Sequence, residues 1–185
     1  QKIFMSELLK KNKVLVEDLI AEKSFEFTVL DGRDGVRKQL ESVDINRPGL
    51  SLTGWYKHFT DRRLQVFGLT ELDYLSSLPE NQMIEAIEQF FQRDNTAVII
   101  TRNIKPPEHF YYYARLTKTP LLLTPFSATE IIRQLIPFLE IKLNPRVIFH
   151  GELVEVFGVG ILILGKSGIG KSECVLELVR RNHLF

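Results

Sequence analysis

Residues 165–172 constrain this chain more tightly than any other part of its sequence. They read Gly-Lys-Ser-Gly-Ile-Gly-Lys-Ser, which fits the pattern G-x-x-x-x-G-K-[ST] of phosphate-binding loops. An apolar run of strand length, residues 160–164, precedes them, and residues 173–181 carry apolar side chains at helical spacing. The sequence therefore predicts a loop that joins a buried strand to the N-terminus of a helix.

Phosphate binding requires these residue types in this order. Glycines allow the backbone to curl so that its N–H groups approach a polyphosphate, and the helix N-terminus adds partial positive charge. Lys171 can reach the β- and γ-phosphates of a nucleotide, and Ser172 can ligate Mg²⁺. A chance match in a glycine-containing turn is the competing interpretation, with an expected frequency of about one per cent in a chain of this length. The candidate nucleotide-binding residues are Gly165, Lys166, Ser167, Gly168, Ile169, Gly170, Lys171 and Ser172, and Ser172 is also the candidate metal ligand.

The composition restricts the expected partners and compartment. The 185 residues carry a formal net charge of +1, which favours neither nucleic acid nor an anionic membrane as a partner. The sequence contains one cysteine and lacks an apolar run long enough to cross a bilayer. It therefore predicts no internal disulfide, no membrane span and a cytoplasmic location. The chain does not begin with methionine and ends at Phe185, shortly after the loop, so we expect it to stop inside its catalytic domain.

The region before the loop alternates between strand and helix patterns. Residues 96–101 and 121–124 are apolar runs that predict strands, and residues 80–91 predict an amphipathic helix. Capping boxes at Thr70–Asp73 and Ser127–Glu130 predict two helix starts. Alternation of this kind with short connections is typical of an open α/β domain with parallel strands.

Two prolines indicate where this domain should end. Pro137 and Pro145 bracket a segment that we expect to connect two domains. The predicted organisation is an N-terminal α/β domain over residues 1–135, a linker over residues 136–146, and the start of a nucleotide-binding domain over residues 147–185.

A hairpin is predicted directly before the loop. Residues 147–157 and 160–164 are separated by a connection too short for parallel strands, so they should pair antiparallel. If residues 158–159 form a two-residue turn, His150 falls opposite Ser167, and a three-residue turn moves it one residue further along the loop. A structural histidine at the end of a sheet is the competing interpretation. We expect His150 beside the bound phosphates, where an imidazole could contact phosphate oxygens or the incoming nucleophile.

Three segments in the last part of the chain together resemble one enzyme family. They are HGELVEVFGVG at residues 150–160, GKSGIGKSE at 165–173 and LELVRRNH at 176–183. This combination resembles the HPr kinase/phosphorylases, and the α/β region before it fits that family's N-terminal domain in position and class. The resemblance implies a Mur-ligase-like N-terminal domain, a phosphoenolpyruvate-carboxykinase-like P-loop kinase domain that is incomplete here, and assembly as a homohexamer.

The resemblance also implies a bifunctional enzyme of bacterial sugar-uptake control and catabolite repression. Such an enzyme uses ATP and Mg²⁺ to phosphorylate a serine of the phosphocarrier protein HPr, and it removes that phosphate by phosphorolysis with inorganic phosphate, which yields pyrophosphate. By motif, residues 165–172 would bind ATP, Ser172 would ligate Mg²⁺, and His150 and Lys171 would be active-site residues. The family's aspartate pair, second metal carboxylate and catalytic arginine would follow Phe185, so we expect these 185 residues alone to bind nucleotide without turnover.

Two other functions fit a phosphate loop in this setting. A small-molecule kinase of the carboxykinase type would transfer phosphate to a metabolite and would ignore HPr. A non-enzymatic, nucleotide-gated sensor or assembly module would bind nucleotide without any turnover. An assay with ATP, Mg²⁺ and HPr separates these functions from the protein-kinase interpretation.

Overall fold

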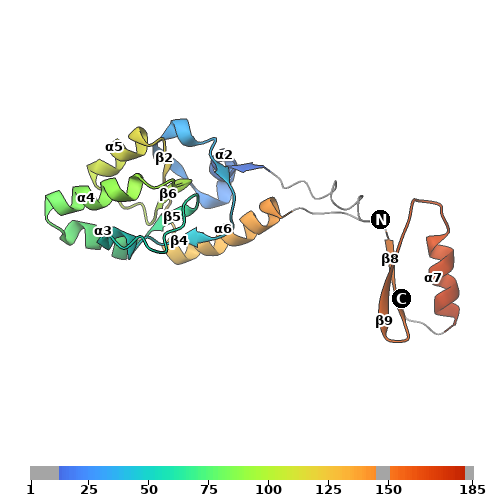
Figure 1. The fold of residues 1–185 in the computed structure, drawn as a ribbon. Coiled ribbons are helices and arrows are strands. Elements are labelled where there is room, and N and C mark those ends of the chain that lie inside the picture. Colours follow the sequence, from blue (N-terminus) through green and yellow to red (C-terminus); the bar gives the residue numbers. More distant parts are fainter. Residues whose placement is uncertain (1–12, 145–150, 182–185) are drawn as a thin grey trace. The chain divides into compact units, whose positions relative to one another are not determined.

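The computed structural model describes residues 13–144 and 151–181 (Figure 1). These residues belong to two compact units, an N-terminal unit over 13–144 and a C-terminal unit over 151–181. Each unit has its own secondary structure and its own core, so each is described by itself.

A five-stranded sheet forms the centre of the N-terminal unit, in the order β2-β7-β6-β5-β4. Strands β4 to β7 pair in parallel, and β2 pairs antiparallel with β7. All residues of β5 and β6 are buried, as expected for parallel strands covered on both faces. A separate antiparallel pair joins β1 to β3. The strands are β1 Val14–Leu15, β2 Thr28–Asp31, β3 Gln39–Leu40, β4 Ile45–Asn46, β5 Leu64–Phe67, β6 Ala97–Ile100 and β7 Leu121–Leu123.

Helices cover both faces of this sheet and divide its core in two. One face packs against α3, α4 and α5, and the other packs against α2 and α6 (Figure 1). Strand β6 shows the alternation, because Ala97 and Ile99 lie in one core and Val98 and Ile100 in the other. The helices are α2 Val16–Ala21, α3 Leu69–Ser77, α4 Glu80–Phe91, α5 Glu108–Leu116 and α6 Ala128–Leu143, with 3₁₀ turns at Lys23–Phe25, Arg33–Gly35 and Ser51–Thr53.

The predicted α/β pattern is confirmed, including one of the two capping boxes. Residues 96–101 contain β6, residues 121–124 contain β7, and residues 80–91 form α4. The Ser127 hydroxyl accepts a hydrogen bond from the Glu130 N–H, and the Glu130 carboxylate accepts one from the Ser127 N–H. These bonds to Ser127 hold the pKa of Glu130 below its usual value. The capping box is therefore where the local sequence placed it.

The capping box predicted at Thr70–Asp73 is wrong. Helix α3 begins at Leu69, its N-cap is Gly68, two residues before the predicted Thr70, and the Glu71 carboxylate accepts the Gly68 N–H at 2.9 Å. Glu71 also pairs with Arg47 at 3.0 Å and is buried. The ion pair with Arg47 thus favours Glu71 as the acidic residue that caps the helix. Arg47 lies far from Glu71 in the sequence, so the local spacing of residues could not predict this choice.

Replacing Glu71 with alanine is expected to lower the free energy of unfolding by about 2 kcal/mol, because it removes a charged partner from a buried backbone N–H. Urea denaturation followed by the fluorescence of Trp55, the single tryptophan of the chain, measures this change in the N-terminal unit. Glu130→Ala, at the exposed cap of α6, is the matched control and should cost less, about 0.5–1 kcal/mol. Equal losses from both changes would contradict the role assigned to Glu71.

Helix α6 differs from the predicted domain organisation. It continues through Pro137 to Leu143, so residues 136–143, expected in a linker, are helical. An interior proline removes one backbone hydrogen bond and costs about 3 kcal/mol. Buried apolar residues nevertheless recur at helical spacing on both sides of the proline. Their burial offsets the cost of the lost hydrogen bond. These residues are Ile131, Leu135, Leu139 and Leu143.

The C-terminal unit is a hairpin followed by a helix. Strands β8 Gly151–Val156 and β9 Val159–Leu164 pair antiparallel, and α7 Lys171–Arg180 contacts β8. The antiparallel hairpin is confirmed.

The turn of this hairpin is one residue earlier than predicted. Phe157 and Gly158 form it, with φ of 52° and 77°, and Val156 pairs with Val159. Both central residues have positive φ, as in the type I′ turn that suits hairpins. The predicted turn would have placed Val159 at such a position, which a β-branched residue resists.

This shift moves the strand register by two residues. Gly151 pairs with Leu164, whereas the predicted register places it opposite Lys166. His150 lies outside the described residues, so its expected position beside the phosphates remains a prediction. None of the helices in the described ranges, 13–144 and 151–181, is long and apolar enough to traverse a bilayer.

Candidate phosphate-binding site

The loop between β9 and α7 has a backbone that requires its glycines. Gly168 and Gly170 have φ of 80° and 91°, in the left-handed region that glycine adopts readily. Gly170 is the N-cap of α7, and its carbonyl accepts a hydrogen bond from the Cys174 N–H at 3.0 Å. At Gly165 an added Cβ would lie 2.9 Å from a methyl group of Ile169. The loop thus curls tightly onto the first turn of a helix, as the motif predicted.

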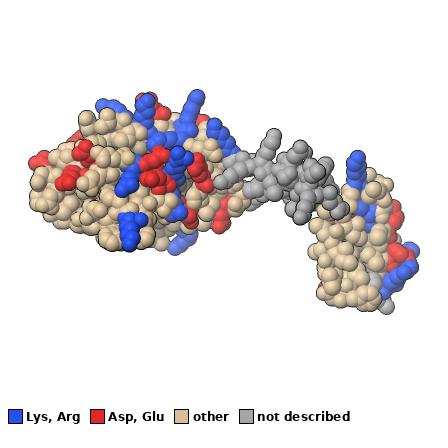
Figure 2. All heavy atoms as spheres, viewed as in Figure 1, with Lys and Arg blue, Asp and Glu red and all other residues tan. Residues whose placement is uncertain are grey.

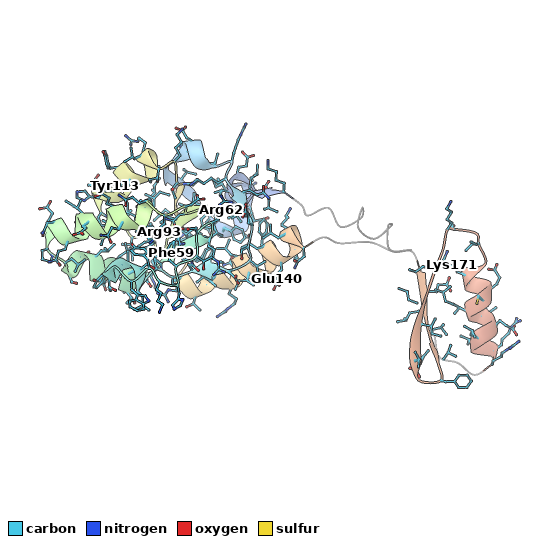
Figure 3. All side chains as sticks on the ribbon, in the orientation of Figure 1. Phe59, Arg62, Arg93, Tyr113, Glu140 and Lys171 are labelled. Atoms are coloured by element: carbon cyan, nitrogen blue, oxygen red, sulfur yellow. The ribbon has the colours of Figure 1, made fainter. Side chains whose placement is uncertain are left out.

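The ammonium group of Lys171 is held over this loop. Its Nζ donates hydrogen bonds to the carbonyl oxygens of Gly165 and Lys166, each at 2.9 Å, and Figure 3 labels this lysine at the start of α7. The cation therefore stands at the N-terminus of α7, where the helix dipole also favours a bound anion. The Lys166 side chain is exposed and makes no such contact in the described structure. Of the two loop lysines, Lys171 is the one placed to meet a phosphate.

Ser172 and Glu152 supply oxygen ligands next to the loop. The Ser172 hydroxyl donates a hydrogen bond to a carboxylate oxygen of Glu152, which lies on β8. Oxygen donors of this kind suit Mg²⁺, which keeps several waters and binds through few protein groups plus substrate phosphates. Within the described residues there is no group of three or more His, Cys, Asp or Glu side chains that could hold a metal by themselves. The site therefore fits a magnesium ion that arrives with a nucleotide.

The core of the C-terminal unit is small. Among its described residues, Val154 of β8 and Val175 of α7 are the buried apolar side chains. A larger set of apolar side chains in this unit is exposed. These are Leu153, Phe157, Val159, Ile161, Leu162, Leu164, Ile169, Leu176 and Val179.

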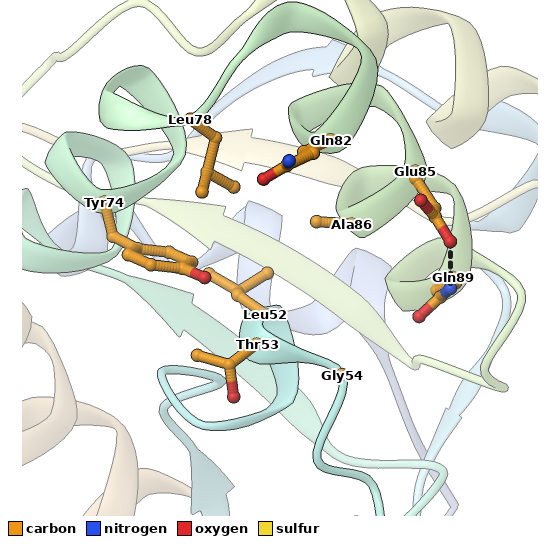
Figure 4. A pocket seen from close by; sticks show the side chains of 9 residues that line it. All are labelled: Leu52, Thr53, Gly54, Tyr74, Leu78, Gln82, Glu85, Ala86 and Gln89. Carbon is orange, nitrogen blue, oxygen red and sulfur yellow. Dashed lines mark hydrogen bonds between the residues drawn. The ribbon is translucent and has the colours of Figure 1, made fainter.

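One hollow on the N-terminal unit lacks the chemistry of a phosphate site. It has a volume of about 280 Å³ and lies between the Ser51–Thr53 turn and helices α3 and α4 (Figure 4). Its lining includes Tyr74 and Glu85, the latter bonded to Gln89, but no lysine or arginine. A polyphosphate placed there would find no cation to neutralise it.

Charged side chains elsewhere on this unit largely neutralise one another. Figure 2 shows lysines and arginines interspersed with acidic residues on its visible face. Arg62 contacts both Asp94 and Glu41, and Arg63 pairs with Asp44. The loop of the C-terminal unit, by contrast, combines an ammonium group with the N-terminus of a helix.

The structure brings together the predicted loop residues and adds one that sequence reasoning missed. Residues 165–172 form one continuous turn onto α7, as predicted, while His150 is not among the described residues. Glu152 was not predicted as a site residue, although the alternation of exposed and less exposed residues along β8 places it on the less exposed face. It shares the inner face of the strand with buried Val154, and α7 contacts this strand.

Comparison with known proteins agrees with the sequence patterns in both units. Residues 14–139 match the family model described as HPr Serine kinase N terminus, and residues 141–185 match HPr Serine kinase C-terminal domain. The HPr kinase/phosphorylase of Brevibacillus brevis is 38% identical over 159 residues, covering 86% of this chain and 51% of that protein. The HPr kinase/phosphorylase of Clostridium novyi is 38% identical over 171 residues, covering 92% of this chain and 55% of that protein. The chain thus spans about half the length of these relatives.

One solved structure is also similar, at a lower level. It is the regulatory region of Clostridium perfringens pyrophosphatase, with its CBS and DRTGG domains, complexed with diadenosine tetraphosphate. The TM-score is 0.45 at 9% identity, over 66% of this chain and 45% of that one. A likeness of this size carries no argument about function.

Proposed function

Because the chain belongs to the HPr serine kinase family, we propose that it supplies the nucleotide-binding loop of an enzyme that phosphorylates a serine of HPr with ATP and removes that phosphate by phosphorolysis. The observation that carries the proposal is the Lys171 ammonium held over a glycine loop at a helix N-terminus. This loop lies inside the segment that matches the family's C-terminal domain. The family and the site therefore support the same chemistry.

The proposal assigns a role to each loop residue. The backbone N–H groups of residues 165–170 bind the β- and γ-phosphates, and Lys171 neutralises the charge on the transferred group. Ser172 is the protein ligand of Mg²⁺, which when bound would neutralise further phosphate charge. His150 is proposed as an active-site residue that contacts a phosphate oxygen or the attacking group.

The two directions of the reaction share this positioning. In the forward direction the serine oxygen of HPr attacks the γ-phosphorus of ATP, the bond to ADP breaks, and the serine proton leaves to a base. In the reverse direction an oxygen of inorganic phosphate attacks the phosphorus of phosphoserine, the bond from that phosphorus to the serine oxygen breaks, the serine oxygen takes up a proton, and the pyrophosphate formed is released. Both directions require that the negative charge on the transferred phosphoryl group be neutralised. In this proposal, Lys171 does so from its position over the loop.

The same proposal extends to the whole protein. It includes a Mur-ligase-like N-terminal domain, a phosphoenolpyruvate-carboxykinase-like kinase domain, a homohexamer and a cytoplasmic role in catabolite repression and sugar transport. The family resemblance supports these features. The proposed domain junction lies in the short segment after α6, since that helix packs with the N-terminal unit as far as Leu143.

The test supplies the full-length protein with ATP, Mg²⁺ and HPr and measures phosphate on the HPr serine. Addition of inorganic phosphate to phosphorylated HPr should then release pyrophosphate. Transfer to a metabolite with none to HPr would refute the proposal in favour of a small-molecule kinase. Nucleotide binding without turnover by the full-length protein would instead identify a nucleotide-gated module.

A further inference from the structure

We propose that Glu152 is a positioning residue for the metal at this loop, because its carboxylate holds the Ser172 hydroxyl in the orientation that a cation requires. The inference rests on the proposed nucleotide function and names a residue outside the loop motif. It makes strand β8, and not the loop alone, part of the metal site.

The contact joins two elements that are held in place independently. Ser172 lies in the first turn of α7, and Glu152 is the second residue of β8, where it pairs with Ile163 of β9. Buried Val154 and Val175 form the core between β8 and α7. The strand and the helix are thus packed together two or three residues from the hydrogen bond, which limits how far either partner can move.

The direction of the hydrogen bond determines its consequence. A serine hydroxyl has one hydrogen to donate and two lone pairs that accept. Because the Ser172 hydrogen is donated to Glu152, both lone pairs remain available to a cation. Donation to a carboxylate also makes the hydroxyl oxygen more electron-rich and therefore a better ligand.

Neighbouring acidic residues do not offer the same contact. Glu155 lies on the opposite, exposed face of β8, as the alternation of buried and exposed residues along this strand shows. Glu173 follows Ser172 on α7, and its side chain is exposed. Glu152 is partly buried, faces α7 and accepts the Ser172 hydrogen. Outer-shell partners of this kind typically change metal affinity by about 10- to 100-fold.

The test measures the affinity of the full chain for a fluorescent ATP analogue at increasing Mg²⁺ concentration and in EDTA. Glu152→Ala should raise the Mg²⁺ concentration needed for half-maximal binding by about 10- to 100-fold and leave the affinity in EDTA unchanged. Glu152→Gln, which preserves shape and an acceptor but not the charge, should give a smaller shift. Glu155→Ala, on the same strand, should give none.

A second variant shows whether Glu152 acts through Ser172. In a Ser172→Ala background, Glu152→Ala should add no further shift, because the hydroxyl that it positions is gone. An equal shift in both backgrounds, the same loss in EDTA, or no shift in either Glu152 variant would overturn the inference. Failure of the unaltered chain to bind the analogue at all would instead count against the proposed nucleotide function.

Discussion

Replacing Lys171 with methionine is expected to raise the dissociation constant for ATP about 100-fold. Hydrogen bonds to two carbonyl oxygens hold the ammonium group over the loop. A bound phosphate would therefore meet this positive charge without any movement of the lysine side chain. Hydrogen bonds to charged groups contribute about 1.5–3 kcal/mol each, and every 1.4 kcal/mol is about tenfold in affinity. Methionine is an unbranched side chain one heavy atom shorter than lysine, so the substitution removes the ammonium group and keeps most of the apolar stem. Isothermal titration with ATP and Mg²⁺ measures the change.

The matched control is Lys166→Met, the same substitution five residues earlier in the same loop. The Lys166 side chain is exposed, so its loss should change the dissociation constant less than about threefold, as expected for a screened surface charge. In the HPr assay with the full-length protein, Lys171→Met should lower the rate about 10²–10³-fold, the typical cost of removing one donor to a developing charge. Equal effects of the two lysine changes would refute the assignment of Lys171.

Replacing Phe90 with alanine is expected to destabilise the N-terminal unit by about 3–5 kcal/mol. Phe90 is fully buried and meets Phe67 and Phe91 edge to face, with ring centroids 5.1 and 5.3 Å away. The substitution removes a large apolar side chain and leaves a cavity. The surrounding aromatic side chains are packed against other core residues and cannot move far enough to fill it. Because small proteins are stable by only about 5–15 kcal/mol, this is a large share of the total.

Urea denaturation followed by Trp55 fluorescence measures this loss, since the tryptophan lies in the same unit. Tyr112→Ala is the control, because that side chain is 62% exposed and should cost less than about 1 kcal/mol. Phe90→Leu keeps most of the volume and should fall between the two, and it provides a folded variant if the alanine variant does not accumulate. A loss below about 1 kcal/mol for Phe90→Ala would contradict the packing described for this core.

Patterns of a few neighbouring residues were enough to predict much of the fold. The amphipathic repeat of α4, the apolar run of β6 and the capping box at Ser127 each depend on residue types at short spacing within one element. The loop of residues 165–172 belongs to the same class, because its glycines, lysine and serine act within a single turn. Local sequence therefore predicted the position of this loop and the lysine at the start of its helix.

Contacts between distant segments could not be predicted in this way. Glu71 caps α3 from a position that Arg47 helps to select, 24 residues earlier, and α6 continues past Pro137 because its buried face outweighs a lost backbone bond. The predicted hairpin turn was one residue too late for a different reason. The length of the connection alone does not show that a β-branched residue such as Val159 resists positive φ.

The sequence by itself determined the strand-loop-helix unit, because that unit depends on residue types at short, regular spacing. Only the tertiary structure decided that Glu152 meets Ser172 across 20 residues, that Arg47 meets Glu71, and that α6 ends at Leu143. These outcomes depend on how the strands and helices pack against one another and on how much apolar surface that packing buries. Neither can be read from short stretches of sequence.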